Sequence, residues 1–88
     1  TLMKILFKKR FVKQYQKLKK FDQNKVDHAL KMFEKDPCDS RLKNHALIGK
    51  LSGKRSISAG FNLRMIFELE GDYVVVIMIG VGTHNQVY

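Results

Sequence analysis

The hydrophobic pattern of this chain changes period part-way along, and the change limits the folds open to it. Phe11, Tyr15 and Leu18 recur at the spacing of one helix face. A second stripe with helical spacing consists of Val26, Ala29, Leu30 and Phe33. From Ile57 to Leu69, apolar and polar residues alternate instead, as in a strand with one buried face. The chain therefore combines a helical first half with a sheet-forming second half.

Turn signals divide these halves into elements. Residues 2–7 are a short apolar segment that predicts a first strand, Asp22 is a candidate N-cap for the second helix, and Pro37 ends that helix. The alternating segment is longer than one strand usually is, so we expect a turn near Ala59-Gly60. Residues 70–72 indicate a hairpin turn, and the β-branched run of residues 73–79 predicts a central strand.

The resulting order is strand, helix, helix and three antiparallel strands. This order predicts a single α+β domain over residues 1–88, with an N-terminal strand, a helical hairpin and a three-stranded antiparallel meander in one sheet. The helices need the apolar sheet face, so the other face is expected to stay partly open. We expect Ser58, Asn62 and Arg64 to project from this open face, opposite Leu63 and Met65.

The charge of the chain is large and uneven. The sequence has 17 Lys and Arg against 8 Asp and Glu, a net charge of +9, and 13 of the basic residues precede His45. Such a field attracts polyanions without reading their sequence. The single cysteine, Cys38, excludes an internal disulfide, and the longest apolar run is far short of the about 20 residues that span a bilayer. With no signal-peptide pattern at the start, we expect a cytoplasmic protein without a membrane segment.

The second half carries residues suited to cleaving RNA without a metal. The 2′-OH of RNA can attack the adjacent phosphorus when one group takes its proton, a cation stabilises the phosphorane and an acid protonates the leaving 5′-oxygen. Histidine suits the proton transfers, and arginine suits the phosphate. We therefore select His84 as general acid or base, Arg64 and Arg55 as phosphorane-stabilising cations, and Tyr88 as a base-stacking or proton-transfer group. Without a carboxylate cluster for magnesium or closely spaced zinc ligands, we expect no metal and no cofactor.

Each of these residues also has a purely structural interpretation. Arg64 could pair with Glu68 on the same strand face, and His84 could be an ordinary surface residue. Gly80 and Gly82 favour the exit of a strand over a nucleotide-binding loop, because no helix is expected after them.

Four strings carry a family resemblance: residues 45–49 (HALIG), 53–55 (GKR), 63–67 (LRMIF) and 82–88 (GTHNQVY). In this order they resemble the RelE/ParE toxin superfamily, and most closely its RelE and YafQ-like branch. The resemblance implies a ribosome-dependent endoribonuclease that cuts mRNA in the A site and needs no metal. It also implies a cognate antitoxin, which we expect to be acidic or amphipathic and to wrap the helices.

Carried over position by position, the resemblance implies specific roles. His84 matches the catalytic histidine of YafQ-like members, and Arg64 matches the strand arginine that steadies the phosphate. Arg55 falls where the RelE branch has a catalytic lysine or arginine, Tyr88 matches its near-terminal tyrosine, and His45 matches the histidine that opens the YafQ-like loop.

Two positions depart from the pattern of the family. Ser58 stands where YafQ-like members carry another active-site histidine, and Asn62 stands where they carry an aspartate. RNA contacts are expected from Lys50, Lys54, Asn62, Ser58, Lys13, Lys17 and Lys20. Two alternatives stay open: a ParE-like inhibitor of DNA gyrase that cuts nothing, and a basic RNA-binding module with little or no catalytic activity.

Overall fold

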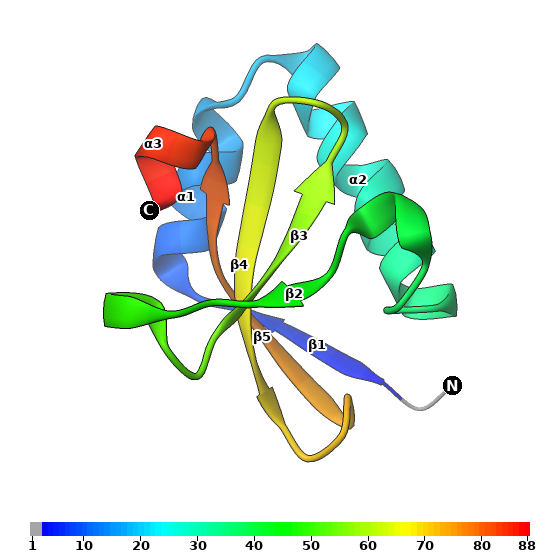
Figure 1. Ribbon diagram of the computed structural model, residues 1–88. Helices are drawn as coiled ribbons and strands as arrows, with labels where there is room; N and C mark the ends of the chain where they lie inside the picture. Colours follow the sequence, from blue (N-terminus) through cyan, green and yellow to red (C-terminus); the bar gives the residue numbers. More distant parts are fainter. Residues whose placement is uncertain (1–2) are drawn as a thin grey trace.

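The computed structural model describes residues 3–88, in which two helices cover one face of a five-stranded sheet (Figure 1). The strands are β1 (Lys4–Phe7), β2 (His45–Ala46), β3 (Arg55–Ala59), β4 (Leu63–Glu70) and β5 (Val75–Gly82). Their order across the sheet is β1-β5-β4-β3-β2, with β1 parallel to β5 and every other pair antiparallel. The α+β prediction is confirmed, and β2 is a strand beyond the four that were expected.

The helical hairpin is confirmed, but its turn lies earlier than expected. The two long helices are α1 (Lys9–Lys17) and α2 (Lys20–Lys35). Extended backbone at Leu18 and Lys19 separates them, so Lys19 is the N-cap of α2 and the expected cap at Asp22 is wrong. Asp22 lies in the first turn instead, where a carboxylate favours the positive end of the helix dipole. The helix ends before Pro37, as expected, and no helix in residues 3–88 is long and apolar enough to cross a membrane.

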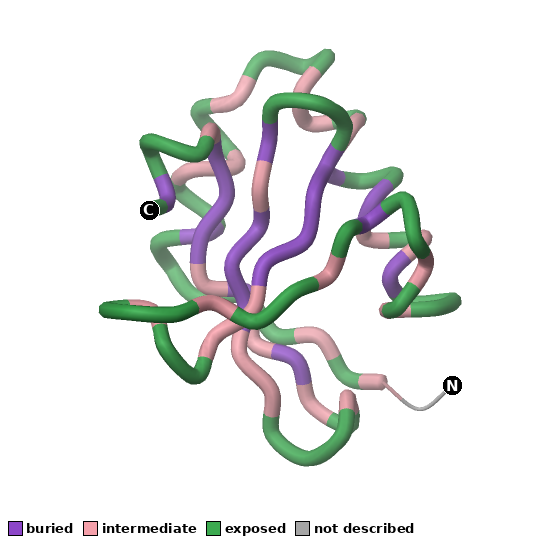
Figure 2. Tube along the Cα trace, in the orientation of Figure 1, coloured by how far each residue is buried: buried purple, intermediate pink, exposed green. Residues whose placement is uncertain are grey.

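The core lies between the two helices and the sheet, and Figure 2 shows buried backbone concentrated in β3, β4 and β5. The residues of the core are Phe11, Val26, Ala29, Phe33, Leu42, Ile57, Ala59, Leu63, Met65, Phe67, Val76, Met78 and Val81. At its centre the rings of Phe33 and Phe67 meet edge to face, with centroids 5.1 Å apart. Both helical stripes and the alternating strand residues therefore meet in one core, as their periods predicted.

The strands of the meander differ in detail from the expected boundaries. The predicted turn after Ala59 is present, since β3 ends there and β4 begins at Leu63. The strand β5 begins at Val75 rather than at residue 73, because Tyr73 has a φ of 63° and belongs to the turn that follows β4. It also continues to Gly82, which brings the two C-terminal glycines into the sheet.

The sheet face turned away from α1 and α2 carries mostly small or polar residues. Pairing places Ser56, Ile66 and Gly80 in one row across β3, β4 and β5 on this open face. The next row consists of Ser58, Arg64 and Gly82. Ser58 and Arg64 therefore lie on the expected side of the sheet, although Ser58 is buried there and only Arg64 is half-exposed. For Asn62 the expectation is wrong, because this residue lies in the turn and its Oδ1 accepts a hydrogen bond from Lys25 of α2.

A short helix, α3 (His84–Val87), follows β5 directly and packs against β4 and β5 (Figure 1). The expectation that no helix follows Gly82 is therefore wrong. A helix of four residues is too short to show a helical period in its hydrophobic pattern. Its start nevertheless has a sequence signature, because Thr83 and Gln86 have the spacing of a capping box.

Candidate active site

Arg64 is the second residue of β4 and lies half-exposed near one end of the open face. Its strand partners are Ser58 on β3 and Gly82 on β5. The Nη1 atom donates hydrogen bonds to the backbone carbonyls of Leu63 at 3.0 Å and Phe61 at 3.4 Å. No ion pair joins Arg64 to Glu68 among residues 3–88, so the structural alternative for this arginine is wrong. The arginine is oriented by carbonyls and keeps its positive charge uncompensated by an acid.

The helix α3 brings His84 and Tyr88 to the same face. His84 is the first residue of the helix, two positions after the Gly82 partner of Arg64, and its side chain is exposed. Its ring meets that of Tyr88 edge to face, with centroids 4.3 Å apart. The Tyr88 hydroxyl in turn donates a 2.7 Å hydrogen bond to Oγ of Ser56, which is fully buried. Ser56 therefore holds Tyr88, and Tyr88 holds one side of the His84 ring.

Tyr88 also lines a hollow of about 250 Å³. The remaining lining residues come from the segment after β2: Leu47, Ile48, Lys50 and Leu51. Ile48 is 90% exposed, so the hollow has an apolar rim as well as one lysine. An aromatic ring, apolar side chains and a cation at one opening are the groups that bind an unpaired base next to its phosphate.

His45 belongs to the same side of the sheet. It lies opposite Ser56 in the β2–β3 pair, and directly paired residues share a face. Its Nδ1 lies 2.9 Å from the carbonyl oxygen of Lys43. Because a carbonyl oxygen only accepts, Nδ1 carries the proton, and Nε2 is the ring nitrogen that can accept one.

Arg55 does not join this group. It pairs with Phe67, a core residue, and so lies on the helix side of the sheet. Its Nε donates to Oδ1 of Asn44 at 2.8 Å, while Nδ2 of Asn44 donates to the carbonyl of Pro37 and to the hydroxyl of Tyr73, both at 2.9 Å. These bonds tie the segment before β2 to the turn before β5, so Arg55 is placed for a structural role.

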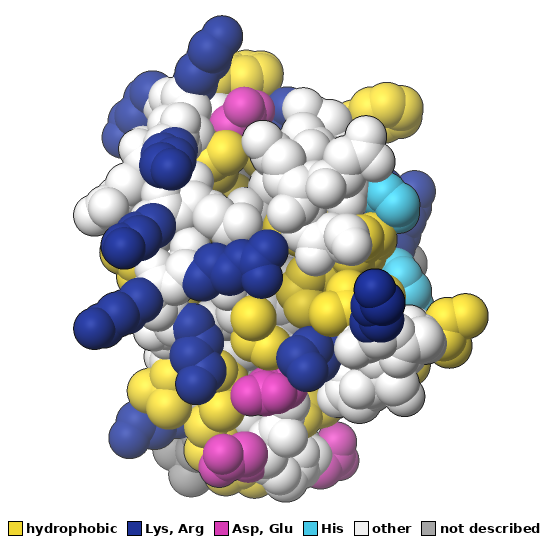
Figure 3. All heavy atoms as spheres, turned by 90° about the vertical axis from the view of Figure 1, so that its left-hand side faces the viewer, with side chains coloured by type: hydrophobic (Ala, Val, Ile, Leu, Met, Phe, Trp, Pro, Cys, Tyr) yellow, Lys and Arg dark blue, Asp and Glu magenta, His cyan; other side chains and the backbone are white. Residues whose placement is uncertain are grey.

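The predicted RNA-binding lysines fall into two groups. Lys50 lines the hollow beside Tyr88, whereas Lys54 lies in the turn before β3. Lys13 and Lys17 are exposed on α1, and Lys20 is the exposed first residue of α2. Figure 3 views the side formed by α1 and α3, where Lys and Arg side chains gather along the left and across the middle of the view. The basic residues expected from the sequence therefore form a field on the α1 side of the molecule, and Lys50 adds a cation beside Tyr88.

The sequence predictions missed Ser56, which has no charge and no motif of its own. Its importance comes from Tyr88, 32 residues further along the chain, and only the folded structure brings the two together. The pattern that could have found the local part of the site is the capping box over Thr83 and Gln86, which fixes where α3 begins.

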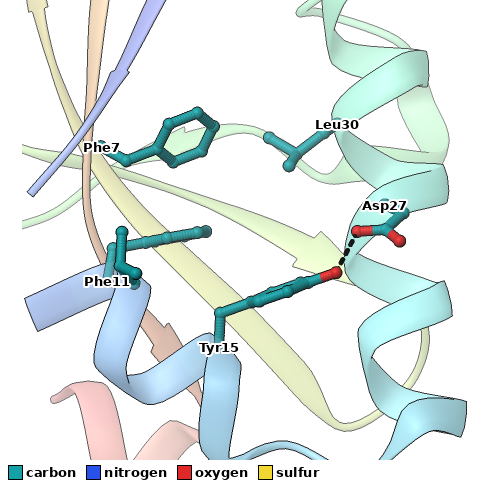
Figure 4. A pocket seen from close by; sticks show the side chains of 6 residues that line it. Phe7, Phe11, Tyr15, Asp27 and Leu30 are labelled. Carbon is teal, nitrogen blue, oxygen red and sulfur yellow. Dashed lines mark hydrogen bonds between the residues drawn. The ribbon is translucent and has the colours of Figure 1, made fainter.

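A separate apolar pocket of about 250 Å³ lies on the helix side, between β1, α1 and α2 (Figure 4). Its lining residues are Phe7, Phe11, Val12, Tyr15, Asp27 and Leu30. The Tyr15 hydroxyl donates a 2.7 Å hydrogen bond to Asp27, and this bond raises the pKa of Tyr15 above its ordinary value. The polar groups of the pocket thus satisfy each other. No group of three or more His, Cys, Asp or Glu in residues 3–88 is arranged to hold a metal ion, here or elsewhere.

Comparison with known proteins identifies the family. The sequence model of the YafQ family, described as the bacterial toxin of type II toxin–antitoxin systems, matches residues 3–88. The chain belongs to the YafQ toxin family. A comparison with the curated proteins gives no match.

Solved structures agree with this membership of the YafQ family. The crystal structure of YafQ from E. coli strain BL21(DE3) superimposes with a TM-score of 0.80 at 19% identity, covering 98% of each chain. A copper-bound mutant toxin from Helicobacter pylori gives 0.77 at 26% identity, covering 98% of this chain and 99% of that one. YafQ in the E. coli DinJ–YafQ toxin–antitoxin complex gives 0.79 at 20% identity, covering 100% of this chain and 99% of that one. These structures share the fold, and the family match makes this chain a YafQ-type toxin.

Proposed function

We propose that this YafQ-family toxin is a metal-independent endoribonuclease that cleaves mRNA in the ribosomal A site. The observation that carries the proposal is the grouping of His84, Arg64 and Tyr88 at one end of the open sheet face. A proton-transfer group and a cation without an acidic partner are groups that cleavage by the 2′-OH uses, and an aromatic ring can stack on the neighbouring base. The resemblance of residues 82–88 to the RelE and YafQ-like branch further supports the proposal, because it matches His84 to a catalytic histidine.

The proposed reaction uses these groups in one displacement. One histidine takes the proton of the 2′-OH, whose oxygen bonds to the adjacent phosphorus while the bond from phosphorus to the 5′-oxygen breaks. The 5′-oxygen receives a proton, so the products are a 2′,3′-cyclic phosphate and a 5′-hydroxyl. We assign one proton transfer to His84 and the other to His45, and we assign to Arg64 the stabilisation of the phosphorane charge. Tyr88 stacks on the base next to the scissile phosphate.

Binding to the ribosome is assigned to the basic surface. The positive charges of Lys13, Lys17 and Lys20 attract RNA phosphates whatever the RNA sequence. In this proposal Lys50 contacts the mRNA beside Tyr88. Because each neutralised phosphate releases counterions, we expect affinity for ribosomes to fall steeply between 50 and 200 mM salt, by about 10³-fold or more if six phosphates are contacted. An affinity that stays flat over this range would contradict an RNA-facing basic surface.

The decisive experiment maps mRNA 5′ ends in a translation extract, with a metal chelator present in the protein preparation. We expect new ends within codons at the ribosomal A site. His84→Ala should abolish these ends and leave ribosome association largely intact. The matched control is His28→Ala, which removes an exposed histidine from α2 and should cleave like wild type.

The same experiment separates the alternatives. Unchanged cleavage by His84→Ala would remove His84 from the proposed chemistry. Intact mRNA with wild-type protein would instead reject the nuclease, and a DNA supercoiling assay would then test inhibition of gyrase. Ribosome binding without either effect would leave a simple RNA-binding module.

We further propose that a cognate antitoxin neutralises this toxin. E. coli YafQ is found in complex with DinJ. The net charge of +9 favours an acidic or amphipathic partner segment that wraps the helices. The test is co-purification with the small protein encoded beside it, and failure to recover a complex at low salt would contradict the proposal.

A further inference from the structure

The end of β5 is held from two sides by glutamine side chains. Oε1 of Gln14, on α1, accepts a 2.9 Å hydrogen bond from the backbone N–H of Val81. Oε1 of Gln86, on α3, accepts a 2.8 Å hydrogen bond from the backbone N–H of Thr83. Figure 1 shows that α1 and α3 lie beside the same end of β5. Two helices far apart in the sequence thus fix the backbone just before His84.

The two glycines of this segment provide space for the glutamines. A Cβ at Gly82 would lie 2.7 Å from Oε1 and 3.0 Å from Cβ of Gln86. A Cβ at Gly80 would lie 3.1 Å from Oε1 of Gln14. Both glycines belong to β5 and neither has a positive φ, so they are needed for close approach and not for backbone conformation.

The position of the His84 ring depends on these contacts. Thr83 is the N-cap of α3, and its side chain accepts a hydrogen bond from the backbone of Gln86 while the Gln86 side chain accepts from Thr83. His84 is the next residue, and its ring packs on Tyr88 one turn later. The start of α3 therefore sets the direction in which His84 leaves the backbone.

We propose that Gln14 and Gln86 are positioning residues that hold His84 in its reactive orientation, with Gly80 and Gly82 as the clearance they require. The inference rests on the proposed nuclease function, in which His84 transfers a proton. Neither glutamine touches the RNA in this scheme. Each glutamine acts by accepting a hydrogen bond from a backbone N–H group, so a glutamate, which has the same shape and also accepts, should replace it.

The test compares Gln86→Met, which removes the acceptor, with Gln86→Glu, which keeps it. We expect Gln86→Met to lower kcat for A-site cleavage by about tenfold or more, since small misplacements of a reacting group can cost about 10²-fold. The KM for ribosomes should stay within about twofold, and Gln86→Glu should restore most of kcat. Gly82→Ala should resemble Gln86→Met, because its methyl group displaces the amide.

Matched controls lie on the same two helices. Asn85→Ala changes the exposed neighbour of Gln86, and Gln16→Met changes an exposed glutamine of α1, to be compared with Gln14→Met. Both controls should cleave like wild type. The inference is overturned if the folded variants Gln86→Met and Gln14→Met keep wild-type kcat, or if Gln86→Glu loses as much as Gln86→Met.

A second measurement keeps this inference separate from the function. The contact between the rings of His84 and Tyr88 can be followed by nuclear Overhauser effects without any RNA. It should be lost in Gln86→Met and kept in Asn85→Ala. If wild-type protein cleaves nothing, the proposed function fails while this result still decides whether Gln86 positions His84. A ring contact that persists in Gln86→Met overturns the inference even if the nuclease is real.

Discussion

The hydrogen bond between Tyr88 and Ser56 should show a marked asymmetry between its two partners. Ser56 is fully buried, whereas Tyr88 is 43% exposed. In Ser56→Ala the tyrosine hydroxyl loses its acceptor but can turn to water, so we expect a loss of about 0.5–1.5 kcal/mol in the free energy of unfolding. In Tyr88→Phe the buried Ser56 hydroxyl loses its hydrogen bond to Tyr88, and we expect a loss of about 1–3 kcal/mol in the free energy of unfolding.

The double variant gives the sharper result. With both hydroxyls removed, no polar group of the pair is left without a partner, so Ser56→Ala/Tyr88→Phe should lose less than the sum of the single changes. The difference is the coupling energy of the pair, and we expect about 1 kcal/mol. Urea unfolding followed by circular dichroism measures all four proteins at one pH and salt concentration.

Additive losses, or a larger loss for Ser56→Ala than for Tyr88→Phe, would refute the reasoning. Either result would mean that the burial of Ser56 does not make its hydroxyl dependent on Tyr88. The Tyr88→Phe variant keeps its ring, so its contact with His84 can be followed separately in the same samples.

Three further predictions concern other parts of the molecule. Phe33→Ala should cost about 3–5 kcal/mol in urea unfolding because the ring fills the centre of the core, whereas Phe61→Ala, at a position 95% exposed, should stay within about 0.5 kcal/mol. The hydrogen bonds from Arg41 hold the pKa of the Asp39 carboxyl at about 2. Any stability from this pair is therefore fully present above the ordinary aspartate pKa of about 3.9 and is lost as the pH falls through 2. An NMR titration should show this low pKa for Asp39, and Arg41→Gln should raise it. Arg55→Ala should lower the free energy of unfolding by about 1–3 kcal/mol and leave kcat within about threefold, and a large loss of kcat in a stable variant would return Arg55 to the reacting groups.

The elements that the sequence predicted well are those long enough to show a period. The stripe around Phe11 and the alternation around Met65 each extend over several turns or residue pairs, and both were assigned correctly. The two elements that were missed, β2 and α3, have two and four residues. Their formation depends on partners elsewhere in the chain: β2 pairs with β3, and α3 packs against β4 and β5.

The residues of the candidate site likewise fall into those that the sequence predicts and those that only the fold reveals. The sequence alone points to His84, Arg64 and Tyr88, because their side chains have a recognisable chemistry and lie in segments that resemble a known family. Ser56 and Gln14 were not, because serine and glutamine are common surface residues. Their partners lie 32 and 67 residues away along the chain, so no local pattern could identify them.

The composition of the open face explains why the site lies at this end of the sheet. Glycine weakens a strand because it has no side chain to pack, yet β5 ends in Gly80 and Gly82. At these positions the missing side chains let two glutamines and α3 approach the strand. The residues that would be poor choices for a purely structural strand therefore lie in the segment that leads through the strand partner of Arg64 to His84. Gly82→Ala should therefore not improve cleavage in the mRNA assay, because any gain in the strand comes with the displacement of Gln86.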